Sequence, residues 1–170
     1  MTTKEPDASI ATAENMWPDI AGRIERESDG IRHILPVRVY FEDTDAGGVV
    51  YHAAYVRFAE RGRTDLLRLL GTDARRMIDG SDSREPAAFV VRRMSFDFAR
   101  PARMDDLLEV VTRVKELGGA SVTLRQTIER AGTRICEADV TVVLVSMAGK
   151  PLRLSAEVRA AFLAQSDSRH

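Results

Sequence analysis

Apolar residues recur with two different periods along the chain, and each period predicts an element. Residues 34–42, ILPVRVYFE, alternate apolar and polar positions, which is typical of a strand with one buried face. The apolar face of this strand is predicted to consist of Val37, Val39 and Phe41. Residues 53–70 follow helical spacing and end before Gly71, a residue type that suits the position after a helix.

The predicted helix has one apolar and one polar side. The apolar side is expected to face a core and consists of Tyr55, Phe58, Ala59, Gly62, Leu66, Leu69 and Leu70. The polar side is expected to face solvent or a second subunit and consists of Arg57, Glu60, Arg61, Arg63, Asp65 and Arg68.

Beyond Pro86 the period returns to two and stays there through four runs: residues 87–99, 106–117, 121–130 and 133–147. Gly-Gly and Ala-Gly pairs separate the last three runs, which are therefore expected to form an antiparallel meander. A short helix is predicted at 74–79, and a terminal helix after Pro151 with Ser155 as its cap. The order predicts an α+β fold, a long central helix packed against an antiparallel five-stranded sheet.

Length and composition fit one domain with a single core. The chain has 170 residues, of which 44% are hydrophobic. The domain is predicted to span residues 34–165. Residues 1–33 are polar and acidic, so they are expected to be disordered apart from a helical segment around 19–27. Residues 166–170 are expected to form a flexible tail.

Charge and cysteine content limit the partners and the compartment. A formal net charge of −1 gives no field that would attract nucleic acid, so no such partner is expected. The single cysteine, Cys136, lies in an apolar run, which predicts a buried, inert thiol and no intramolecular disulfide. No stretch has the length of a signal-peptide core or a transmembrane helix, so a cytoplasmic protein is expected.

The segment EDTDAGGVVYHAAYVRF, residues 42–58, concentrates the candidate chemistry. A calcium loop fits the spacing of its acids, but Gly47 and Ala54 stand where that loop needs oxygen ligands. The three histidines of the chain have no zinc spacing, and no phosphate-binding glycine motif occurs. Neither a metal nor a cofactor is therefore expected.

A turn that leads into the helix is the simplest explanation of this segment, since acids are common in turns and near the positive end of a helix. Two features favour a site instead. Residues 49–51 separate the glycines from the helix, so the acids lie too early to be simple caps. His52 lies at the helix N-terminus, where converging backbone N–H groups would stabilise a developing negative charge.

Two segments resemble a known family. Residues 37–68, VRVYFEDTDAGGVVYHAAYVRFAERGRTDLLR, closely resemble the signature of hotdog-fold acyl-CoA thioesterases of the 4-hydroxybenzoyl-CoA thioesterase class. Residues 89–110, FVVRRMSFDFARPARMDDLLEV, resemble the Tol-Pal-associated branch of that class. The resemblance extends over residues 36–164 and implies hydrolysis of an acyl-CoA thioester to free acid and coenzyme A.

The resemblance also implies roles for the motif residues. The catalytic carboxylate falls on Asp45, as nucleophile or as general base, and the motif ends at His52, a second catalytic candidate. The backbone N–H groups of Tyr51 and His52 are the expected oxyanion donors, and Gly47 and Gly48 are expected to shape the loop.

Other acids and aromatic residues near the motif receive lesser roles. Asp43 is assigned to loop structure. Phe41 is a departure, because the nearest branch often has a second tyrosine directly after the position of Tyr40. The hydroxyl that Phe41 lacks would have to come from Tyr51 or Tyr55.

Substrate and partners follow from the same resemblance. The arginine candidates for binding the anionic part of coenzyme A are Arg92, Arg93, Arg100 and Arg103. An acyl carrier protein is an alternative carrier of the acyl group. The family implies a homodimer or homotetramer and a functional link to envelope Tol-Pal proteins. Two competing functions exist on this fold: a non-catalytic acyl-binding or envelope-associated interaction protein, and a hydratase or dehydratase, which would leave the thioester intact.

Overall fold

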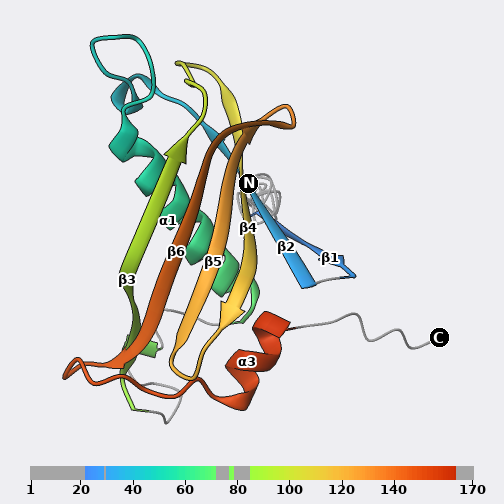
Figure 1. The fold of residues 1–170 in the computed structure, drawn as a ribbon, viewed down its shortest axis with the longest axis vertical. Coiled ribbons are helices and arrows are strands. Elements are labelled where there is room, and N and C mark those ends of the chain that lie inside the picture. Colours follow the sequence, from blue (N-terminus) through green and yellow to red (C-terminus); the bar gives the residue numbers. More distant parts are fainter. Residues whose placement is uncertain (1–21, 29, 72–76, 79–84, 164–170) are drawn as a thin grey trace, which may run out of the picture.

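The computed structural model describes residues 22–28, 30–71, 77–78 and 85–163, which form one antiparallel sheet and two helices (Figure 1). The strands are β1 (Arg23–Glu27), β2 (Gly30–Arg38), β3 (Ala87–Phe98), β4 (Leu107–Leu117), β5 (Ser121–Arg130) and β6 (Thr133–Ser146). The helices are α1 (His52–Leu69) and α3 (Ala156–Leu163). The 6-stranded sheet has the order β1-β2-β4-β5-β6-β3, with every neighbouring pair antiparallel.

Helix α1 runs along one face of this sheet (Figure 1) because its apolar stripe needs a partner surface. Ala54, Tyr55, Phe58, Ala59 and Leu66 are all buried against strand residues of that face. At Gly62 the helix comes so close to the sheet that an added Cβ would lie 2.8 Å from Cγ1 of Val110. The prediction of a long helix packed on an antiparallel sheet is confirmed.

The core under α1 also holds the thiol of Cys136, on β6. Its side chain is fully buried in the cluster that includes Tyr55 and Phe58. Burial raises the pKa of Cys136 to about 12. The predicted buried, inert thiol agrees with this position.

The face of the sheet that lies away from α1, called the far face below, is polar and rich in ion pairs. Arg113 contacts Glu27 at 2.6 Å, and Lys115 contacts Asp139 at 2.6 Å. The Arg125 guanidinium, hydrogen-bonded to Asp139, lowers the pKa of that carboxyl to about 2. The two faces therefore divide into an apolar one that holds the helix and a charged one.

The N-terminal prediction is wrong in part. Residues 23–27 form strand β1, where a helical segment was expected, and the sheet starts eleven residues before the predicted boundary at Ile34. β1 pairs with β2 from Arg23 opposite Ile34 to Glu27 opposite Gly30, which brings the strand count to six where five were predicted. RIERE has one apolar residue, Ile24, and no alternating pattern of its own, so it forms a strand because β2 offers its free edge.

Other predictions divide between confirmed and wrong. The β4-β5-β6 meander is confirmed, and so is the Ser155 cap, whose hydroxyl accepts the Val158 N–H at 3.2 Å. Phe41 is 81% exposed in a 3₁₀ turn, because the strand ends at Arg38, so it does not share a buried face with Val37. The predicted helix at 74–79 falls mostly outside the described residues, as do residues 166–170.

Two residues assigned to the polar side of α1 are buried. Arg63 and Asp65 are only 6% and 5% exposed. Arg63 donates to Oε1 of Gln126 at 2.8 Å, and Asp65 accepts from Nε2 of His33 at 2.8 Å. The sheet extends far enough beneath α1 to cover both side chains and supplies a polar partner for each.

Among the described helices, neither is both long and apolar enough to cross a membrane.

Candidate active site

Asp43 fixes the loop between β2 and α1. Its carboxylate is buried and accepts the Tyr40 N–H at 3.0 Å and a guanidinium N–H of Arg57 at 3.3 Å. Its carbonyl oxygen accepts the Tyr51 N–H at 2.8 Å. Asp43 thus joins the start of the loop to the start of the helix, in agreement with the structural role predicted for it.

Asp45 lies two residues later in the same loop but is exposed. Its backbone is held by the Val49 carbonyl at 2.9 Å and by the Gly48 N–H at 3.0 Å. The side chain accepts one hydrogen bond, from the Gly47 N–H to Oδ1 at 2.8 Å. Its second oxygen, Oδ2, has no hydrogen-bond partner among the described residues and is therefore available to a reactant.

The two glycines shape this turn in different ways. Gly48 has a φ of +72°, a backbone conformation that residues with a side chain rarely adopt. At Gly47 an added Cβ would lie 3.0 Å from Oδ1 of Asp45, so a side chain there would crowd the carboxylate. Both observations support the loop-shaping role predicted for Gly47 and Gly48.

The N-terminus of α1 is uncapped. Tyr51 stands at the N-cap without a side-chain capping bond, and the Ala54 N–H turns back to the Tyr51 carbonyl at 2.8 Å. The N–H groups of His52 and Ala53 have no acceptor among the residues that the structure describes. The Tyr51 N–H, one of the two predicted oxyanion donors, already donates to the Asp43 carbonyl, whereas the N–H groups of His52 and Ala53 are open to an acceptor.

A pocket of about 280 Å³ lies between this helix end and the end of β3. Its lining consists of Val50, His52, Tyr55, Phe98, Ala99, Arg100 and Pro101. The lining is mostly apolar, with His52, Tyr55 and Arg100 as its ionisable residues. Such a surface suits an acyl or pantetheine chain near polar groups that orient it.

Tyr55 anchors the far wall of the pocket. Its buried hydroxyl accepts the Ala102 N–H at 3.1 Å, while the Ala102 carbonyl accepts the Val50 N–H at 2.8 Å. Burial raises the pKa of Tyr55, so the hydroxyl stays neutral. Since no described residue accepts its proton, that proton can point to a ligand, which makes Tyr55 a better substitute than Tyr51 for the hydroxyl missing at Phe41.

The four predicted arginines do not come together. Arg100 lines the pocket and donates to the Arg134 carbonyl at 3.0 Å. Arg103 follows in the adjacent loop, where its backbone N–H donates to Asp106 at 2.8 Å. Arg92 and Arg93 lie near the middle of β3 and line a different hollow. Sequence position alone could not separate them, because all four fall within twelve residues.

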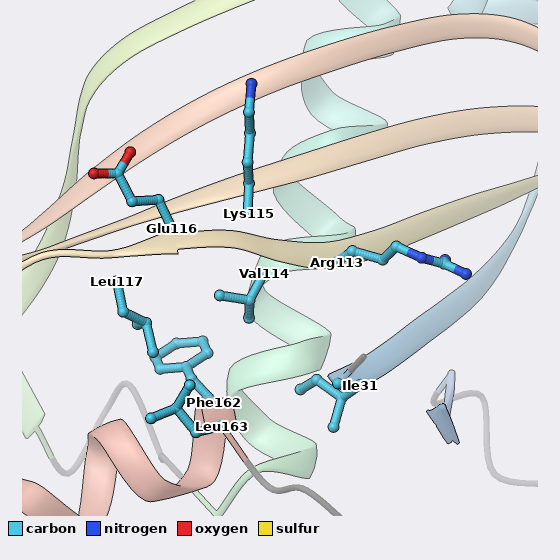
Figure 2. Close-up of a pocket in the computed structure, with 9 residues that line it drawn as sticks. Ile31, Arg113, Val114, Lys115, Glu116, Leu117, Phe162 and Leu163 are labelled. Carbon is cyan, nitrogen blue, oxygen red and sulfur yellow. The ribbon is translucent and has the colours of Figure 1, made fainter. Parts of the chain in front are cut away.

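A second hollow, of about 200 Å³, lies where β2 and β4 meet α3 (Figure 2). Its lining includes none of the candidate catalytic residues of the loop and the start of α1. Ile31, Val114, Leu117 and Phe162 gather there, while Lys115 and Glu116 point away (Figure 2). Among the described residues, no group of three or more histidine, cysteine, aspartate or glutamate side chains could hold a metal ion.

The profile of the thioesterase superfamily matches residues 47–137, more than half of the chain. The chain belongs to this superfamily. It is 43% identical to the acyl-CoA thioesterase YbgC of Haemophilus influenzae over 129 residues, which cover 75% of this chain and 92% of the relative. It is 45% identical to the acyl-CoA thioester hydrolase YbgC of Escherichia coli O6:H1, with the same coverage.

A solved structure gives the same picture. The crystal structure of a probable thioesterase from Bartonella henselae superposes with a TM-score of 0.70 at 41% sequence identity. The match covers 73% of this chain and 99% of the Bartonella protein. The family fold and the resemblance inferred from the motif are thereby confirmed.

Proposed function

We propose that this thioesterase-superfamily protein hydrolyses acyl-CoA thioesters, with Asp45 as the catalytic carboxylate. The observation that carries the proposal is the contrast in the loop: Asp43 is buried and bonded, whereas Asp45 is exposed with one oxygen free. The uncapped start of α1 supplies N–H groups for the oxyanion. The names of the two YbgC relatives support an acyl-CoA substrate.

Two routes use the same groups. In the first, an Asp45 oxygen attacks the thioester carbon, the C–S bond breaks, and the thiolate leaves and takes a proton from water. Water then cleaves the mixed anhydride and regenerates the carboxylate. In the second, Asp45 takes a proton from the attacking water and the thiolate receives it. In both routes the N–H groups of His52 and Ala53 stabilise the oxyanion, by about 3 kcal/mol per donor.

The pocket residues bind and orient the substrate in this proposal. The His52 ring holds the thioester or the water, and the Tyr55 hydroxyl, fixed by Ala102, donates toward the same space. Arg100 provides the positive charge nearest the pocket for the anionic part of coenzyme A, with Arg103 next to it.

We propose a homodimer that pairs through β3. This strand is at the edge of the sheet, and its other edge has no partner among the described strands. Its exposed apolar side chains are Val90, Val91, Met94 and Phe98. A long apolar edge favours pairing with a second copy, and Phe98 would bring the contact to the pocket. Native mass spectrometry distinguishes the dimer from a homotetramer.

A cytoplasmic location and a link to envelope Tol-Pal proteins are proposed from the sequence resemblance, and a single cysteine, which allows no intramolecular disulfide, suits a reducing compartment. The competing function is a non-catalytic acyl-binding or Tol-Pal-associated interaction protein, which predicts no release of thiol. An acyl carrier protein substrate predicts release from the carrier and none from acyl-CoA.

The experiment is free-thiol release from short, long and aromatic acyl-CoAs by the wild type, Asp45→Asn and Glu42→Gln. We expect Asp45→Asn to lose roughly 10²–10⁴-fold in kcat/KM. Glu42 is an exposed carboxylate in the same loop, and its variant should stay within about twofold. Full activity in folded Asp45→Asn would refute the assignment, and no release by the wild type from any acyl-CoA or acyl carrier protein would refute hydrolysis.

A further inference from the structure

A row of polar side chains crosses the far face of the sheet from β4 to β3. Glu116 on β4 stands opposite Thr123 on β5, Thr123 stands opposite Thr141 on β6, and Thr141 stands opposite Arg93 on β3. The two threonine hydroxyls are hydrogen-bonded at 3.0 Å. With Arg92, Gly118 and Ser121, these residues line a hollow of about 320 Å³, called the far-face hollow below.

This hollow is separate from the candidate active site. Val122 and Leu124 are buried in the core under α1, so Thr123 between them points to the opposite side of the sheet. The pocket beside His52 meets β3 at Phe98, five residues beyond Arg93, or about 17 Å along the strand. The two cavities have no lining residue in common.

Arg92 and Arg93 differ from the other cations of the sheet. Every other arginine or lysine in the described strands has an interaction partner, as in Arg113 with Glu27 and Lys115 with Asp139. Arg92 and Arg93 have neither a hydrogen bond nor an ion pair with any described residue, although Glu116 lines the same hollow. Two adjacent guanidinium groups on a surface that pairs its charges elsewhere leave an anion to be supplied from outside.

We propose that the far-face hollow binds a phosphate ester. Arginine is suited to this task because its planar guanidinium donates two parallel hydrogen bonds to phosphate oxygens. The hydroxyls of Ser121 and Thr123 can donate to further oxygens, and Glu116 accepts from a hydroxyl or amino group at the other end. The row spans three strand spacings, about 14 Å, which suits a ligand of nucleotide size.

Pairing of β3 with a second copy leaves this hollow accessible. Strands pair through backbone groups in the plane of the sheet, while the side chains stand perpendicular to it. The midpoint of Ala87–Phe98 falls between Arg92 and Arg93. Full-length antiparallel pairing would therefore set the arginines of both copies side by side and strengthen the attraction for phosphate.

Direct binding tests the proposal without use of activity. Inorganic pyrophosphate and ADP are titrated calorimetrically into the wild type, Arg92→Gln/Arg93→Gln and Arg113→Gln. Arg113→Gln removes one ion-paired cation from the same face and serves as the matched control. We expect wild-type binding, at least tenfold weaker binding in the double variant with an unchanged Tm, and binding within twofold in the control. Equal binding by the double variant, or no binding of either probe by the wild type, would overturn the proposal.

Two sources of the phosphate remain, and kinetics separate them. One source, which rests on the proposed function, is the nucleotide end of acyl-CoA. If this source is correct, the double variant raises KM for acyl-CoA at least fivefold and leaves KM for the matching acyl-pantetheine unchanged. A separate phosphorylated ligand leaves both KM values unchanged while pyrophosphate binding is lost. Either result supports the site. Pyrophosphate binding by a wild type that hydrolyses no thioester would refute the proposed function alone.

Discussion

The loop and first residue at the start of α1 carry residue types similar to those in the second half of the helix, but in opposite states. At the N-terminal end, Asp45 and His52 are exposed, and the first N–H groups of the helix have no described acceptor. Further along, Arg63 and Asp65 are buried and bonded to partners on the sheet. A buried charge is tolerated only when its partners are fixed, whereas an uncommitted group in water keeps its bonding capacity for a reactant. One end of the helix is thus suited to chemistry and the other to stability.

The largest effect expected from this contrast is on folding. Asp65→Ala removes the acceptor of His33, of the Gly22 N–H and of Arg68 at once, and should lower the free energy of unfolding by about 3–5 kcal/mol. Asp45→Ala should change it by less than about 0.5 kcal/mol. Urea denaturation measures both. Equal losses at the two positions would remove the distinction between the ends.

His52→Ala tests whether the exposed start of α1 contributes to activity and not to stability. The ring lines the pocket but makes no described hydrogen bond, so its loss should lower kcat/KM by roughly 10–100-fold and leave the unfolding free energy unchanged. Thiol release and urea denaturation of the same preparation provide the two readouts. If activity persists and stability drops, His52 is a loop anchor.

Acid should lower the free energy of unfolding through His33, the buried partner of Asp65. Burial lowers the pKa of this histidine and Arg68 lowers it further, although Asp65 raises it, and Nδ1 has no hydrogen-bond partner among the described residues. Near and just below pH 6.5 the unfolded chain therefore binds more protons than the folded protein. Stability should fall as pH drops below about 6.5, by at most about 1.4 kcal/mol per pH unit.

His33→Gln is the control for that pH dependence, because an amide keeps a donor for Asp65 and does not titrate. The unfolding free energy of this variant should be flat between pH 7 and 5, apart from contributions of the carboxylates at the acid end. The same slope in the variant and the wild type would assign the acid sensitivity to other groups.

The smallest effect on activity is expected at Tyr55, whose hydroxyl both anchors the loop and lines the pocket. Tyr55→Phe leaves the buried Ala102 N–H without its acceptor, which should cost about 1–2 kcal/mol of stability. It also removes the hydroxyl from the pocket, so kcat should fall several-fold with the loop still closed by the Val50–Ala102 bond. A variant that loses stability and keeps full kcat would limit Tyr55 to anchoring.

Local pattern predicted most of the fold. The helix predicted at 53–70 is found at His52–Leu69, because its apolar period and its following glycine are both local signals. Strand β1 was missed, since five residues of which four are charged form a strand only when β2 is beside them. The burial of Asp65 was missed for the same reason, because its partner His33 is 32 residues away.

The candidate site was predictable only where the motif is contiguous. Asp43, Asp45, Gly48 and His52 have positions that the loop sequence anticipates. The Tyr55–Ala102 bond joins residues 47 positions apart, and nothing in the local sequence indicates it. The division of the four arginines between two cavities likewise depends on where β3 ends and on which face each side chain stands.

The lone thiol of Cys136 can report how often the core of the protein opens. It is the one cysteine in the chain, and its burial, which raises the pKa of the thiol to about 12, leaves almost no thiolate at pH 8. A thiol reagent that counts released coenzyme A will therefore have almost no background from the folded enzyme. In the absence of substrate, the rate at which the same reagent labels Cys136 measures how often β6 separates from α1.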